Sequence, residues 1–136
     1  MANPQTGFTA TFRAEAATNL SGAANIGLAV AVNTAGRLVL ATSATGVGFA
    51  GILLDGGLAA GGECLVCVLG PCKIRLGAAT NEGAFVRTAA DSRMDPVNAA
   101  NDFICGKVFQ AGADGDEVDG MVLHGQTSNG ATGEAA

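Results

Sequence analysis

The sequence predicts an all-β fold: a small barrel or sandwich built from two related four-stranded units, with an extended N-terminal arm. Three observations lead to this prediction. Short apolar runs alternate with turn residues, among which glycine is prominent, with 21 in 136 residues. No stretch shows a convincing helical period. The second half of the chain repeats the first, and apolar runs joined by residues that tolerate positive φ are typical of consecutive strands.

The duplication is clearest between residues 49–71 and residues 103–125. Each copy begins with an apolar run that carries a glycine, continues through a turn of glycine, alanine and aspartate, and reaches a glutamate before a second apolar run. Matched positions lie 54 to 56 residues apart, and the match extends upstream of both copies. The matched pairs include Gly51 and Gly106, Glu63 and Glu117, and Asn25 and Asn81. We interpret this pattern as an internal duplication of one unit of roughly four strands.

The chain divides by pattern into three parts. Residues 1–24 form an N-terminal arm, and residues 125–136 form a small, polar C-terminal tail. Between them lies a β-rich domain, residues 25–124, with internal repeats at about 25–70 and 81–124. We expect the repeats to form the core of the fold and the arm to stand apart from it.

Local patterns predict the individual strands in chain order. Residues 8–14 alternate between apolar and polar side chains, which is the period of a half-buried strand. Residues 28–33 and 37–42 are joined by a short link that ends in Gly36, which predicts a hairpin. Further strands are predicted at residues 46–54, 64–69, 72–76, 84–88, 93–97, 103–109 and 118–123.

Two prolines add detail to this strand pattern. Gly70 and Pro71 are expected to interrupt the chain before residues 72–76, because proline cannot donate a hydrogen bond to a ladder. Pro96 is expected to mark an exposed edge strand.

Composition and charge exclude several classes of function. The net charge is −5 and the seven basic residues are scattered, whereas direct nucleic-acid binding needs a positive footprint. No apolar run approaches the ~18 residues of a membrane span. The N-terminus lacks the charged start and apolar centre of a secretory signal, so the chain is expected to be cytosolic when made. Because alanine and glycine dominate and Trp and Tyr are absent, we expect stability to come from assembly with itself or with a larger partner.

The arm is costly to order. Fixing residues 1–24 costs on the order of 24 to 48 kcal/mol, at about 1 to 2 kcal/mol per residue. Offsetting that cost requires about 1,000 to 2,000 Å² of apolar burial at ~25 cal/mol per Å². Two phenylalanines and a few alanines cannot supply so much area, so we expect the arm to dock on something.

The four cysteines leave three interpretations open. Cys64 and Cys67 form a C-x-x-C pair, followed by Cys72 and, far along the chain, Cys105. Four thiols could hold a tetrahedral zinc ion, but zinc knuckles sit in tight turns, whereas the sequence around Cys64 and Cys67 predicts a strand. Residues three apart on a strand point to opposite faces. Small buried thiols are therefore the favoured interpretation, with a disulfide and a zinc site as alternatives.

Other motifs carry little chemistry. The G-x-G-x-x-G match at residues 46–51 leads into a short strand rather than a helix, so nucleotide binding is not expected. The acidic run that begins at Asp114 lacks the spacing of a calcium loop, because its fifth and twelfth positions are Val118 and Gly125. His124 has no neighbouring nucleophile. We therefore predict that the protein is not an enzyme and assign no catalytic, cofactor-binding or metal-binding residue.

Taken together, these features resemble a widespread family of small head proteins of tailed bacteriophages that is associated with capsid decoration, or cement, proteins. The resemblance covers residues 25–125 and rests on glycine spacing and apolar runs. The segments that carry it are Gly70-Pro71 before a strand, Asn81-Glu82-Gly83 before Phe85-Val86, and Phe103-Ile104-Cys105-Gly106. Two features depart from the family pattern: the arm is long, and the four cysteines are not a family signature, which leaves a structural disulfide open on a virion surface.

The resemblance implies a β-rich structural protein located in the virion, on the capsid surface. Its partners would be the major capsid protein and further copies of itself, often as a homotrimer, with no direct contact to nucleic acid or membrane. Phe8, Phe12 and Arg13 are our candidate partner-binding residues, in an arm that adds a strand to the sheet edge of a neighbour. On this interpretation, deleting residues 1–14 leaves a folded domain that no longer decorates capsids.

Two other classes of function compete with this one. The first is another β-rich virion component, such as a tail, neck or spike protein, which would differ in copy number. The second, less favoured, is a small ligand-binding barrel or enzyme, which would need a polar constellation in a pocket. The sequence offers one histidine and dispersed carboxylates for such a site.

Overall fold

The computed structural model of the protein describes residues 7–42, 48–57, 59–97 and 102–124. These residues form nine strands and one short 3₁₀ turn, so the all-β class is confirmed. The strands are β1 (Phe8–Arg13), β2 (Ala29–Val32), β3 (Leu38–Leu40), β4 (Phe49–Asp55), β5 (Glu63–Arg75), β6 (Phe85–Thr88), β7 (Met94–Pro96), β8 (Gly106–Val108) and β9 (Glu117–Val122), and the 3₁₀ turn is η1 (Ala23–Asn25).

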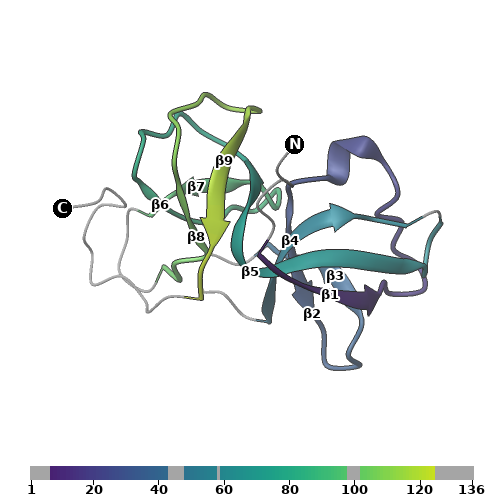
Figure 1. The fold of residues 1–136 in the computed structure, drawn as a ribbon. Coiled ribbons are helices and arrows are strands. Elements are labelled where there is room, and N and C mark those ends of the chain that lie inside the picture. The colour runs from purple at the N-terminus through teal and green to yellow at the C-terminus, as the bar shows by residue number, and fades with distance from the viewer. Residues whose placement is uncertain (1–6, 43–47, 58, 98–101, 125–136) are drawn as a thin grey trace, which may run out of the picture.

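The strands form one strongly curled antiparallel sheet in the order β3-β2-β4-β5-β9-β8-β6-β7, with β1 paired to β5 off this path. Figure 1 shows two lobes, with β1 to β4 in one and β6 to β9 in the other. The long strand β5 runs from the first lobe into the second. We call β1 to β4 with residues 63–69 the first unit, and residues 70–76 with β6 to β9 the second unit.

The two units repeat the same strand order and the same backbone hydrogen bonds. The order β3-β2-β4-β5 in the first unit corresponds to β7-β6-β8-β9 in the second. At the hairpin, the Asn33 amide donates to the Arg37 carbonyl at 2.9 Å, and the Ala89 amide donates to the Arg93 carbonyl at 2.8 Å. The two related four-stranded units predicted from the sequence are therefore present.

The structure corrects the position of the arm, because β1 belongs to the first unit rather than standing apart from it. It pairs with β5 of its own chain over its whole length. Just beyond β1, Ala14 meets Leu38 of β3 in a parallel bridge, and in the second unit Leu76 meets Met94 of β7 in the same way. Each unit therefore curls until its first strand meets the strand at the other end of its sheet, which is β3 in the first unit and β7 in the second. In this comparison β1 corresponds to residues 70–76.

The arm docks on the protein itself over the described residues. Phe12 packs against the core of the first unit, where Ala14 is 1% exposed. Ladder hydrogen bonds to β5 add to this apolar burial, at a net gain of about 0.5 to 1.5 kcal/mol each. The expectation that residues 1–14 can be removed without unfolding the domain therefore loses its basis.

The predicted interruption at Gly70 and Pro71 does not occur. Strand β5 continues through both residues, and Gly70 takes a φ of +98°. At this point β5 exchanges β4 and β1 for β9 as its ladder partner. Proline is tolerated where the partner changes, and its carbonyl still accepts a hydrogen bond from the Gly7 amide at 3.0 Å.

Two clusters of buried apolar side chains form the core. The smaller one fills the first unit, and the larger one fills the second unit and the junction between the two. Strand β2 serves both clusters, because Val30 belongs to the first and Ala29 and Ala31 to the second. The buried hydroxyl of Ser92 also joins the units, since it donates to the Ala41 carbonyl at 2.6 Å.

Other predictions fall partly outside the described residues. The short strand β7 contains Pro96 and ends the sheet path, in keeping with the predicted edge. The polar tail, residues 125–136, lies outside the described residues, as does the start of the arm at residues 1–6. The described part of the chain contains no helix with the length and hydrophobicity that crossing a membrane requires.

Candidate partner-binding surface

Large apolar side chains are exposed around the point where β5 passes from one unit to the other. Phe8 is 75% exposed, and Leu69, its register partner on β5, is 43% exposed. These two residues line a hollow of about 520 Å³ together with Gly7, Gly70, Pro71 and Met121. We call this set of six residues the Phe8 surface.

A β-bulge explains why Phe8 points outward. The register between β1 and β5 shifts between Phe8 and Thr9, so that Phe8 lies opposite Leu69 while Thr9 lies opposite Cys67. Val68 is left between them as the extra residue. A bulge re-aims side chains and adds local twist, and here it releases Phe8 from the inward face that Phe12 occupies.

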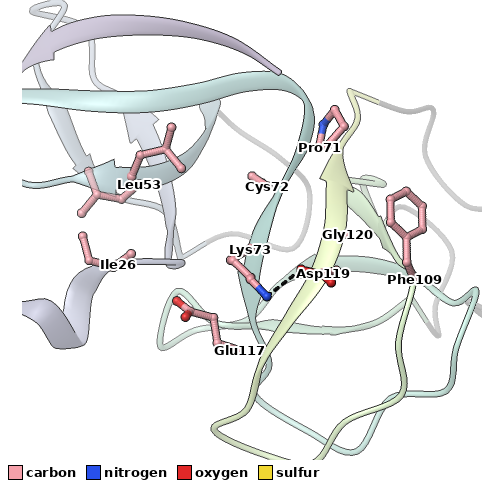
Figure 2. Close-up of a pocket in the computed structure, with 10 residues that line it drawn as sticks. Ile26, Leu53, Pro71, Cys72, Lys73, Phe109, Glu117, Asp119 and Gly120 are labelled. Carbon is pink, nitrogen blue, oxygen red and sulfur yellow. Dashed lines mark ion pairs between the residues drawn. The ribbon is translucent and has the colours of Figure 1, made fainter. Parts of the chain in front are cut away.

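A larger groove of about 630 Å³ continues from the Phe8 surface along the junction of the units. Figure 2 shows Ile26 and Leu53 on one side, Cys72 and Lys73 on β5 in the middle, and Asp119 and Gly120 on β9. The lining residues are Ile26, Leu53, Leu54, Pro71, Cys72, Lys73, Phe109, Glu117, Asp119 and Gly120. Pro71 lines both hollows, so they are neighbours on the surface.

Charged side chains form a polar rim on this groove. Lys73 Nζ lies 2.6 Å from Asp119 Oδ1, and this hydrogen bond raises the pKa of Lys73. Arg75 lies 3.6 Å from Glu117, and its Nε donates to the Ile26 carbonyl at 3.1 Å, which ties the second unit to the first. An apolar centre with a paired polar rim is the composition of a protein–protein contact surface.

The structure separates the three predicted partner-binding residues. Phe8 is exposed and belongs to the Phe8 surface. Phe12 is half-buried against the core of the first unit, so it is a structural residue of this chain. Arg13 is exposed at the end of β1, opposite Glu63 of β5.

Sequence reasoning missed the residues that β5 and β9 contribute. Leu69 and Met121 lie in apolar runs that predict strands, and nothing in these runs marks the two side chains as exposed. Phe109 follows β8 and is 46% exposed. The only available signal was Gly70-Pro71, which marks the exchange of ladder partners around which the exposed residues gather.

All four cysteines are free thiols. Cys64 and Cys67 are buried in different core clusters, in agreement with the expectation that they point to opposite faces. A hydrogen bond with Cys67, together with burial, raises the pKa of the Cys72 thiol. Burial raises the pKa of Cys105, so this thiol stays protonated at neutral pH.

The remaining motifs take structural positions. Asp114 pairs with Arg93 at 3.0 Å, and Asp116 accepts a hydrogen bond from the Ala113 amide at 2.8 Å. The His124 ring lies 5.1 Å from the Phe49 ring, with Nε2 2.8 Å from the Val68 carbonyl. Within the described ranges, no group of three or more His, Cys, Asp and Glu side chains is placed to hold a metal ion. The first two residues of the G-x-G-x-x-G match lie outside the described residues.

Comparison with known proteins gives a similarity of fold. No protein-family model matches the chain, and no curated protein matches its sequence. Among solved structures, the chain is similar to the N base of the head fiber protein gp8.5 of bacteriophage phi29, with a TM-score of 0.58 and 14% sequence identity. The match covers 89% of this chain and 99% of that one, so nearly the whole phi29 base domain has the fold seen here.

Proposed function

We propose that the protein is a structural component of a tailed-phage virion that binds the outer surface of the capsid and stabilises it. The fold supports this proposal, because a base domain of a phage head fiber has the same architecture over nearly its full length. The glycine spacing that resembles phage decoration proteins supports it independently. The partner would be the major capsid protein.

The Phe8 surface is the observation that carries the proposed contact. An apolar aromatic that is 75% exposed is unfavourable in an isolated domain and becomes favourable once a partner covers it. Fully burying one such side chain contributes about 1.5 to 3 kcal/mol. A capsid repeats the contact many times, so weak individual contacts sum to a large stabilisation of the shell.

Co-sedimentation with capsids that lack the protein tests this proposal. Saturable binding near one copy per major capsid subunit, or a simple fraction of that number, is the expected result. Leu69→Asp places a charge on the Phe8 surface and should weaken binding at least tenfold. The matched control is Ala35→Asp, which adds the same charge at the exposed β2–β3 turn and should bind as the unchanged protein does. Absence of saturable binding contradicts the proposal.

A second candidate function is the base of a head fiber or another sparse attachment, and the similarity to the base of the phi29 head fiber favours it specifically. The two candidates share the contact with the head and differ in copy number. About a dozen copies per particle would identify a fiber base or neck component, whereas hundreds of copies identify a decoration protein. Counting bound copies on a gel against the major capsid protein distinguishes them.

A further inference from the structure

The outer edge of β1 is a sheet edge without a strand partner in the described part of the chain. One side of β1 pairs with β5 over residues Phe8–Arg13. On the other side, contact with β3 begins only past the end of β1, at the bridge between Ala14 and Leu38. Thr9, Thr11 and Arg13 are all exposed.

The hydrogen bonds at the end of β1 show which backbone groups face this edge. The Ala14 amide donates to the Gly62 carbonyl on the β5 side at 2.9 Å, whereas the Glu15 amide points away and donates to Leu38 of β3 at 3.0 Å. Successive residues in an antiparallel strand direct their backbone groups to opposite sides. Thr9 and Thr11 therefore direct both N–H and C=O groups toward the free edge.

The equivalent edge in the second unit is occupied. There the Arg75 amide, at the end of β5, donates to the Gly27 carbonyl of the first unit at 3.1 Å. In the first unit no such neighbour covers β1 within the described residues. Natural proteins usually protect a free edge with proline, lysine or a bulge, and β1 has only Arg13 at one end and a bulge at the other.

The sequence of β1 is complementary to itself. Phe8-Thr9-Ala10-Thr11-Phe12 reads the same in both directions. If a second β1 lies antiparallel with Ala10 opposite Ala10, each Thr9 faces Thr11 of the second copy. All four threonines then use their outward backbone groups, and the threonine side chains form cross-strand pairs of the kind that stabilise sheets.

We propose that the free edge of β1 binds the same edge of a second copy of this chain, antiparallel and about a two-fold axis at Ala10. The joined strands make one continuous sheet across two molecules. In this register Phe8 lies opposite Phe12 of the second copy, on the same face of the joined sheet. The contact is small, so we expect a weak dimer with a Kd of about 10 to 100 µM. This inference concerns self-association and does not depend on capsid binding.

Sedimentation equilibrium of the purified protein, without capsids, tests the proposal over about 5 to about 500 µM, a range that brackets the expected Kd. The mass should rise from monomer to dimer. Thr11→Pro removes an outward N–H without removing a bond to β5, and should weaken the dimer at least tenfold. Thr11→Val keeps the backbone groups and should dimerise as the unchanged protein does. A monomer throughout, a trimer, or equal association of Thr11→Pro would overturn the proposal.

Amide hydrogen exchange provides a readout on the unmodified chain, so the proposal stays testable even if Thr11→Pro fails to fold. Protection of the Thr9 and Thr11 amides should increase between the low and the high concentration, because the dimer supplies their acceptors. The Phe12 amide faces β5 and should exchange at the same rate at both concentrations. Equal exchange of Thr9 and Thr11 at the two concentrations would overturn the proposal.

Discussion

The first and second units share one design but differ in where their first strand comes from. In the second unit the first strand is the continuation of β5 and is held at both ends by the chain. In the first unit it is β1, a separate strand that pairs with β5 on one side. The last strand of the first unit thus becomes the first strand of the second, whereas β1 is a strand of its own.

This difference explains where exposed apolar residues gather. A strand that continues from another strand has its edge covered, as Gly27 covers Arg75. At β1 no such neighbour covers the edge among the described residues, and the aromatic Phe8 is exposed. The edge is therefore covered where the two units meet and left uncovered at β1 within the described residues.

The largest expected effect comes from removing β1. Deleting residues 1–14 should lower the free energy of unfolding by at least about 4 kcal/mol, because it removes the ladder to β5 and the core contacts of Phe12 and Ala14. That loss is comparable with the whole stability of a typical domain, about 5 to 15 kcal/mol. Urea unfolding followed by circular dichroism measures it.

The matched control is deletion of residues 1–6, which ends before β1 begins and should leave stability within about 0.5 kcal/mol. If the longer deletion unfolds at the same urea concentration as the full chain, then β1 is an independent arm after all. The comparison between the two first strands would then be wrong.

A second, smaller effect tests whether the units are equivalent at a matched position. Gly51 of β4 and Gly106 of β8 face the partner strand so closely that a Cβ would lie 2.1 Å from the Cys67 carbonyl oxygen or 2.6 Å from that of Met121. Gly51→Ala should cost about 3 kcal/mol or more and Gly106→Ala about 2 kcal/mol, since overpacking against backbone forces strands apart.

Gly115→Ala provides the control for this pair. Gly115 has a φ of +88° and nothing within 4 Å of an added Cβ, so only the backbone cost of about 1 kcal/mol is expected. Thermal unfolding of the three variants gives the order directly. Equal effects at Gly51, Gly106 and Gly115 would show that close approach of the strands is not what these glycines permit.

Much of this symmetry could be predicted from sequence, because glycines and apolar runs recur at fixed spacing. Gly51 and Gly106 were matched in that way, and both oppose equivalent residues of β2 and β6, Val30 and Val86. The position of β1 could not be predicted, since its counterpart, residues 70–76, begins with Gly70-Pro71 inside a continuous strand. Phe12 and Ile74 hold equivalent positions, but no shared glycine marks them.

The candidate surface was only partly predictable for a related reason. Phe8 stands out as an aromatic near the N-terminus, but alternation alone gives it the same face as Phe12. The bulge between Phe8 and Thr9 separates the two, and bulges leave no reliable signal in a short strand. The exposure of Leu69 could not be predicted, because exposed and buried strands of similar composition have the same sequence pattern.

The smallest expected effect concerns the pair of strands that ends each unit. In the first unit Val39 of β3 faces Ala31, whereas in the second unit Asp95 of β7 faces Arg87. Arg87 also lies 3.1 Å from Asp102, in an ion pair whose angle is not that of a hydrogen bond. Asp95 Oδ1 is buried and accepts no hydrogen bond among the described residues.

Burial raises the pKa of Asp95, an effect that Arg87 opposes and that Asp91 and Asp114 reinforce. A carboxyl group with a raised pKa favours its neutral form in the folded state, so its ionisation destabilises the protein as pH rises through that pKa. Asp95→Asn should therefore stabilise the protein at pH 7, by less than about 1 kcal/mol because the site is partly solvated. The gain should vanish below the ordinary Asp pKa of about 3.9, where both forms are neutral.

Thermal unfolding of the unchanged protein and of Asp95→Asn at neutral and acidic pH measures this difference. Glu82→Gln is the control, since that carboxylate is exposed and is not among the groups that shift the pKa of Asp95. If Asp95→Asn destabilises the protein at pH 7, then Arg87 needs Asp95 as well as Asp102, and the charged pair holds the second unit as the apolar pair holds the first. If Asp95→Asn stabilises the protein at pH 7, the second unit carries an unfavourable charge at the position that Val39 occupies in the first unit.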